Sequence, residues 1–162
     1  MHTVCLGVVK RLTLSYLTTT LGYLDCYFRA QQLHERVIKH RHSLPFEFKR
    51  KIRSFKEINY FKGTEYRTII LYTGPFFFQN ILPHYYKHFL LLHFSIYSFC
   101  LKNSVFVPNG KACIEKFHSK IHDLFGVEAY TFNNHLLTHL GEFLINLDHL
   151  IYSICSRAFL VY

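Results

Sequence analysis

The chain has 162 residues, of which 50% are hydrophobic and 18% aromatic, with 17 Phe and 12 Tyr but no Trp. A chain of this length can bury one sizeable core, and only 7 Gly and 4 Pro argue against a sandwich built from many tight turns. Five cysteines, odd in number and widely spaced without a C-x-x-C pair, indicate neither a disulfide framework nor a cysteine-rich zinc site. We expect one helical domain over residues 1–162 in a reducing, intracellular compartment.

The formal net charge of +9 is concentrated in one segment of the chain. Between Arg36 and Lys62, nine basic residues stand against two acidic ones, which gives this segment a net charge of +7. Such a concentration attracts phosphate backbones or anionic lipid, and that binding weakens steeply as salt increases. A solvated basic surface without any ligand has the same composition, so both interpretations stay open.

The first third of the chain predicts two helices and a connection. Apolar residues at Val4, Val8 and Leu12 repeat at helical spacing, and a second helix is expected from about Asp25 to His40. The face of this second helix is formed by Tyr27, Ala30, Leu33 and Val37. Residues 43–51 contain a proline and alternate aromatic with charged residues, which favours a loop or a short helical turn.

Residues 53–75 carry start and stop signals for short helices. Ser54 followed three residues later by Glu57 is a capping-box pattern. Thr64 is then expected to cap a helix of residues 65–72, and Gly74-Pro75 is expected to end or kink it. The stretch therefore predicts short, well-bounded helices beside the basic segment.

The second half predicts a buried helix followed by two amphipathic ones. Residues 84–101 are apolar almost all round, which is typical of a helix covered by its neighbours. A loop is expected from Asn103 to Gly110, a helix ending at Gly126, and a last helix capped by Asn133 or Asn134. The expected fold is all-α, one irregular domain of about six helices around residues 84–101. The apolar run of residues 89–101 falls short of the roughly 20 residues that span a bilayer, so no membrane helix or membrane partner is expected.

Histidines offer the candidate metal and catalytic groups. His135 and His139 lie one turn apart on the last predicted helix, a spacing that can bind a divalent ion, but a solvent-facing polar stripe gives the same spacing and H-E-x-x-H is absent. His84, His88 and His93 do not share one face, so hydrogen-bonded core or boundary histidines are expected there. No nucleophile motif, phosphate-binding loop or carboxylate pair is evident. We expect no metal, no cofactor and no small-molecule substrate.

The candidate nucleic-acid-binding residues are the cations of the basic segment. Aromatic side chains alternate with them and offer stacking faces beside phosphate-binding groups, although the same aromatics can instead anchor a loop onto the core. The candidate residues are Lys49, Arg50, Lys51, Arg53, Lys56 and Lys62.

Three blocks of sequence follow one another along the chain. They are MHTVCLGVVKRL at residues 1–12, RSFKEI with KGTEYR and YTGP at residues 53–75 followed by YKHFLLLH at 86–93, and Y-x-x-N-x-H-x-x-x-H-L at 130–140. Together they resemble the transposase-like proteins of DNA transposons related to CACTA-type elements, and the resemblance runs nearly from end to end.

This resemblance implies a cut-and-paste transposase with a ribonuclease-H-like core. In that family three acidic residues hold two divalent metals, Mg²⁺ or Mn²⁺, and a helical segment is inserted between the second and third acids. The family pattern places an aspartate just ahead of the Met-His and a glutamate beyond the Asn-x-His block. Neither Asp25 nor Glu142 stands at such a position. We therefore expect the helical insertion alone, truncated at both ends, without catalytic residues.

Three functional hypotheses follow from the residues and the resemblance together. The first is a catalytically inactive, transposase-derived protein, nuclear if functional, that binds DNA through the basic segment or associates with its own kind. The second is a metal-dependent DNA transposase or nuclease that keeps its activity. The third is a non-functional fragment of a longer gene.

Overall fold

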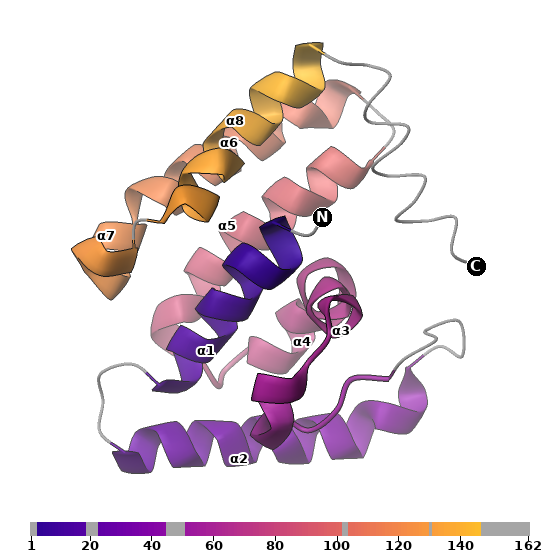
Figure 1. Cartoon of the computed structure of the whole chain (residues 1–162). Coiled ribbons are helices and arrows are strands. Elements are labelled where there is room, and N and C mark those ends of the chain that lie inside the picture. The colour runs from indigo at the N-terminus through magenta and orange to yellow at the C-terminus, as the bar shows by residue number, and fades with distance from the viewer. Residues whose placement is uncertain (1–2, 19–22, 45–50, 102–103, 130, 147–162) are drawn as a thin grey trace. The chain divides into compact units, whose positions relative to one another are not determined.

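The computed structural model describes residues 3–18, 23–44, 51–101, 104–129 and 131–146 (Figure 1). Within these ranges the regular structure is helical and contains no strand, which confirms the predicted all-α class. The described residues of His2–Tyr86 form one compact unit, the N-terminal unit, and those of Lys87–Tyr162 form the C-terminal unit. The expectation of a single folding domain stays a prediction. Among the described helices, none is both long enough and apolar enough to cross a bilayer.

The N-terminal unit begins with a π-helical segment, η1 (Thr3–Val9), that continues as α1 (Lys10–Thr18). Val4, Val8 and Leu12 are buried, as their spacing predicts. Further along, the ring of Tyr16 is fully buried and lies 5.3 Å from the ring of Tyr85. The apolar stripe of the first helix therefore forms part of the core of this unit.

Helix α2 (Tyr23–His40) is followed by one 3₁₀ turn, η2 (Arg41–Ser43). Its inward face is Leu33 and Val37, which are fully buried as predicted. The predicted face is wrong at Tyr27, whose side chain is 55% exposed. Most of the expected 43–51 connection lies outside the described residues.

Residues 55–78 form four helical segments. After η3 (Phe55–Tyr60), a 3₁₀ helix, come α3 (Gly63–Thr68), the π-helical η4 (Ile69–Thr73) and α4 (Gly74–Phe78), the last three without a break. Ser54 caps η3 at the predicted position, because its hydroxyl accepts a hydrogen bond from the backbone N–H of Lys56, whereas the predicted capping box would place that bond at the N–H of Glu57.

Two boundaries in this stretch differ from the prediction. The cap of α3 is Lys62, not Thr64, and its backbone N–H donates to the carboxylate of Glu65 at 2.8 Å. Gly74-Pro75 does not end the helix, because Pro75 falls in the first turn of α4, where a missing N–H is tolerated, directly after a widened π turn.

Helix α5 (Pro83–Cys100) carries the chain from the N-terminal into the C-terminal unit. Phe89, Leu92 and Ile96 are buried, as expected for the most apolar helix of the chain. Phe94 and Tyr97 are 52% and 40% exposed, so the prediction of burial on all sides is wrong for these two positions.

The rest of the C-terminal unit is helical. It consists of η5 (Ser104–Phe106), α6 (Val107–Ser119), α7 (Ile121–Phe125), η6 (Val127–Ala129) and α8 (Phe132–Asn146), and α6 packs along α8 (Figure 1). The predicted loop of residues 103–110 is wrong in its second half, because Pro108 and Gly110 lie inside α6. A Cβ atom at Gly110 would lie 2.7 Å from Cε1 of Phe99, so this glycine permits a close approach of α5 and α6.

Helix ends in this unit are set by short-range hydrogen bonds. Gly126 ends α7 as predicted, with φ of 78° and its N–H bonded to the carbonyl of His122. Asn133 and Asn134 do not cap α8. The hydroxyl of Thr131 accepts from the N–H of Asn134, whose buried side-chain amide donates to the carbonyl of Ala129 at 2.7 Å.

Candidate nucleic-acid interface

The predicted DNA-binding cations do not all have the same surroundings. Lys49 and Arg50 lie outside the described residues. Lys56 and Lys62 are exposed, whereas Lys51 and Arg53 are half-buried. The described cations of the predicted set therefore differ in how much of each side chain is exposed to solvent.

Arg53 is engaged inside the N-terminal unit. Its Nε and one terminal nitrogen both lie 2.9 Å from the carboxylate of Glu65, and it also donates to the backbone carbonyl of Tyr60. The guanidinium carbon lies 5.7 Å from the ring centre of Phe61. A guanidinium held by a bidentate ion pair and an aromatic ring joins η3 to α3, so Arg53 has a structural role in addition to any contact with phosphate.

Glu65 is the buried member of this pair. Its side chain is fully buried, and burial by itself would raise its pKa. Hydrogen bonds from the Arg53 side chain and from the backbone N–H groups of Lys62 and Arg53 outweigh burial and hold the pKa below its ordinary value. Glu65 therefore stays ionised and fixes the segment between Arg53 and Lys62.

Three lysines and a tyrosine on this fixed segment or just before it remain exposed or half-exposed. We call Lys51, Lys56, Tyr60 and Lys62 the cationic segment. Within the described part of the chain, none of the three lysines has a salt bridge to a carboxylate, and the ring of Tyr60 is 72% exposed. Positive charge without a partner beside an exposed ring is the combination that binds phosphate and stacks on bases.

A pocket between α2 and the end of α4 was not predicted from the sequence. We call this cavity of about 550 Å³ the α2–α4 pocket. Its lining from α2 is Gln32, Glu35, Arg36, Lys39 and His40. The remaining lining residues, from α4 and the turn after it, are Phe76, Gln79, Asn80 and Ile81. Sequence spacing could not find it, because its two walls are some 40 residues apart in the chain.

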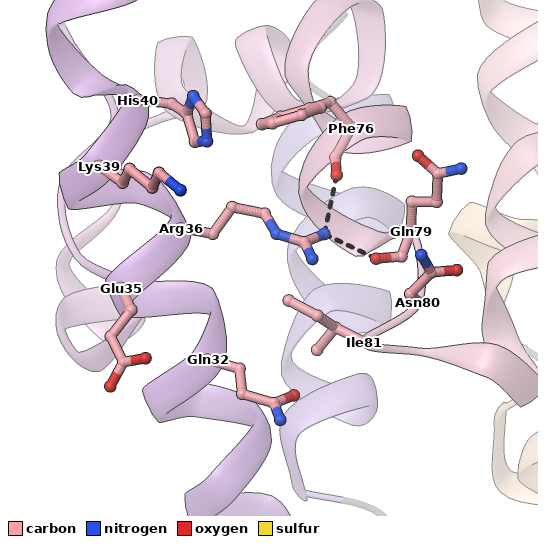
Figure 2. Close-up of a pocket in the computed structure, with 9 residues that line it drawn as sticks. All are labelled: Gln32, Glu35, Arg36, Lys39, His40, Phe76, Gln79, Asn80 and Ile81. Carbon is pink, nitrogen blue, oxygen red and sulfur yellow. Dashed lines mark hydrogen bonds between the residues drawn. The ribbon is translucent and has the colours of Figure 1, made fainter.

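Arg36 is the fixed point of the α2–α4 pocket. One of its terminal nitrogens donates to the carbonyls of Phe76 at 3.0 Å and Gln79 at 2.6 Å (Figure 2). The same nitrogen also donates to the carbonyl of Phe77 at 3.0 Å. These carbonyls are at the C-terminal end of α4, where an arginine is favourable because it satisfies groups that the helix leaves unpaired. The guanidinium of Arg36 is therefore held in the wall of the pocket by these hydrogen bonds.

Phe76 gives the α2–α4 pocket an aromatic side. Its ring is 47% exposed, whereas its neighbours Phe77 and Phe78 are buried. The imidazole of His40 packs edge-on against it, with ring centres 4.8 Å apart, and the guanidinium carbon of Arg36 lies 5.8 Å from its centre. An exposed ring held in place by two neighbours is suited to contact a flat ligand.

The histidines of the C-terminal unit fall into exposed and buried groups. His135 and His139 are exposed, and their Nε2 atoms lie 3.2 Å apart. Glu142, beyond them on α8, is paired with Lys111. Among the described residues, no group of three or more His, Cys, Asp or Glu side chains is arranged to hold a metal ion. His84 is exposed, whereas His93 is buried, as expected for a core or boundary histidine.

His88 is a buried structural histidine, also as expected. It donates through Nε2 to the carbonyl of Phe117 at 3.0 Å and stacks on the ring of the same residue. Burial lowers its pKa to about 4, so it is neutral at neutral pH.

The described residues thus offer a cationic segment and a preformed pocket, both in the N-terminal unit. Both combine basic side chains with an exposed aromatic ring. No protein-family model, curated protein or solved structure matches this chain.

Proposed function

We propose that the chain is a transposase-derived helical protein that does no catalysis and binds double-stranded DNA through its cationic segment. The observation that carries the DNA-binding part is the set of lysines without a carboxylate partner, Lys51, Lys56 and Lys62, within a dozen residues of sequence that also carry the exposed ring of Tyr60. The transposase part rests on the resemblance of the three sequence blocks.

The arrangement of these lysines supports DNA binding over a merely solvated surface. The Arg53–Glu65 pair ties the segment that carries Lys56 and Lys62 to α3, so less backbone freedom is lost when these two lysines meet phosphates. A duplex carries one negative charge per roughly 1.7 Å of its axis, and each neutralised phosphate releases a counterion. Binding through this segment should therefore depend steeply on salt and little on sequence.

The test compares two triple variants of the full chain. In one, Lys51, Lys56 and Lys62 are replaced by Ala, and Arg53 is kept because its loss would disrupt the fold. In the matched control, Lys87, Lys116 and Lys120, exposed lysines of the C-terminal unit, are replaced by Ala. Fluorescence anisotropy with a labelled duplex is measured between 50 and 200 mM salt.

The slope of log K against log [salt] is negative, and we expect the first variant to reduce its magnitude by about 3, since each phosphate contact contributes about 0.9. The control variant should keep the wild-type slope. Equal slopes in all three proteins, or no binding by the wild-type chain, would refute the proposal. Cleavage of a terminal-repeat duplex in the presence of Mn²⁺ would instead favour the second hypothesis, an active transposase.

A further inference from the structure

The α2–α4 pocket has both apolar and basic side chains in its lining. The ring of Phe76 and the side chain of Ile81 are the apolar ones, and the Arg36 guanidinium lies between them (Figure 2). Lys39 and His40, in the last turn of α2, form its basic end and extend toward α4 (Figure 2). A volume of about 550 Å³ is within the range of roughly 300–1,000 Å³ typical of pockets for small ligands.

The charges of the lining favour an anionic ligand at this end. Three carbonyls accept hydrogen bonds from Arg36, so its positively charged guanidinium is held in the wall of the pocket. Glu35 is the one acidic residue of the lining, but its carboxylate accepts a hydrogen bond from Gln31 and points away from Phe76 and Arg36 (Figure 2). Glu35 is one turn before Lys39 on α2, but one of its carboxylate oxygens is already bonded to Gln31.

The remaining polar groups are side-chain amides. Gln32, Gln79 and Asn80 each bring a donor and an acceptor to the rim. Asn80 adopts a left-handed backbone with φ of 64°, which is the position where the chain turns from α4 toward α5. Amides with both hydrogen-bonding functions match the edge of a nucleobase, which carries donors and acceptors side by side.

We propose that the α2–α4 pocket binds one nucleotide of a DNA strand, with its base against Phe76 and its phosphate at Lys39 and His40. The inference rests on the proposed DNA binding for the source of the nucleotide. It adds to that function a site for an unpaired base, at residues that lie outside the cationic segment. A base in this site would gain a stacking partner whose ring is half-exposed in the free protein.

The first experiment uses thymidine monophosphate as the probe and isothermal titration calorimetry with the full chain. We expect saturable binding that Phe76→Leu weakens about tenfold, because leucine keeps apolar volume but not the stacking face. Lys39→Ala should weaken it similarly. The matched controls, Phe94→Leu and Lys116→Ala, change an exposed ring and an exposed lysine of the C-terminal unit and should bind like wild type.

Thymidine and inorganic phosphate are titrated separately, and each should bind more weakly than the nucleotide that combines them. Absence of nucleotide binding at millimolar concentration, or equal affinity of Phe76→Leu and wild type, would overturn the pocket assignment. Circular dichroism confirms that each variant is folded.

A second probe separates the pocket from the proposed function. A labelled duplex with one unpaired thymine should bind more tightly than the fully paired duplex, and Phe76→Leu should abolish only this difference. If paired duplex binds but thymidine monophosphate does not, the pocket assignment fails and the proposed function stands. If no duplex binds while the mononucleotide does, the proposed function fails and the site is one for free nucleotides.

Discussion

Single residues in this protein have roles that their position in the sequence does not indicate. Arg53 belongs by sequence to the basic segment, yet most of its donors are directed at Glu65 and at the backbone of Tyr60. Glu65 looks like an ordinary first-turn acid of a helix, yet its side chain is fully buried. Glu65 needs Arg53 as a partner, because an unpaired charge in the interior is costly, whereas the Arg53 side chain is partly exposed to solvent.

Replacement of Glu65 by Gln should therefore destabilise the chain. We expect the free energy of unfolding to fall by about 2 kcal/mol, since the amide cannot neutralise Arg53 or accept as strongly from the N–H of Lys62. The matched control is Glu57→Gln, an exposed acid 3.9 Å from the same guanidinium, which should leave stability unchanged. Urea unfolding followed by circular dichroism measures both. Equal stability of the two variants would contradict a structural role for the buried pair.

At the scale of helices, one glycine decides how two of them meet. Gly110 lies in α6, and the nearest atoms to a Cβ built there are Cε1 of Phe99 at 2.7 Å, Cδ1 of the same ring at 3.0 Å and Cβ of Ser98 at 3.1 Å. Phe99 is buried, so its ring has little room to move aside. The pattern Pro-Asn-Gly is typical of a turn, but here the glycine serves close packing inside a helix.

Gly110→Ala should lower the free energy of unfolding by about 1–2 kcal/mol, even though alanine is the better helix former by about 1 kcal/mol. Gly63→Ala is the control, because the nearest atom to its Cβ is in ordinary contact at 3.6 Å, and it should be neutral or slightly stabilising. Thermal unfolding would measure both changes. In a Phe99→Leu background the cost of Gly110→Ala should shrink, and a cost that stays the same would rule out the ring as its cause.

At the scale of the whole molecule, two buried titratable groups report on the two units at different pH values. Glu65 is in the N-terminal unit, and its pKa is lowered from the ordinary value of 4.5. The stability that ionised Glu65 gives the folded state is therefore fully present above pH 4.5 and is lost as pH falls through its folded-state pKa. His88 is in the C-terminal unit, and its pKa is lowered from 6.5 to about 4. The imidazole of His88 must be neutral in its buried site, so the folded state does not lose stability through His88 above pH 6.5. The free energy of unfolding falls as pH decreases from 6.5 toward 4.

We expect the unfolding free energy to drop by about 3 kcal/mol between pH 7 and pH 4 through His88, and His88→Phe should remove most of this drop. If the chain is one cooperative domain, as its length and composition predict, then Glu65→Gln and His88→Phe must shift the same transition. Calorimetry across this pH range is the measurement. Two transitions, each moved by only one of the variants, would show that the units unfold independently.

The sequence by itself determined the helical class and most helix positions. Apolar residues at helical spacing, such as Leu33 with Val37 or Ile114 with Phe117, are buried because an amphipathic helix has one face that it must cover. Local signals with a single physical cause were also reliable. Ser54 supplies a hydroxyl to a free backbone N–H, and Gly126 adopts a positive φ.

Only the tertiary structure decided which contacts the polar and small residues make with residues of other helices. The pairing of Arg53 with Glu65, the approach of Phe99 to Gly110 and the meeting of Arg36 with the end of α4 join positions that are 11 to 43 residues apart. Spacing along one helix carries no information about such contacts, because they depend on how separate helices pack. The sequence therefore predicted where positive charge is concentrated, and the structure showed that Arg53 is paired with Glu65 and that a pocket forms between α2 and the end of α4.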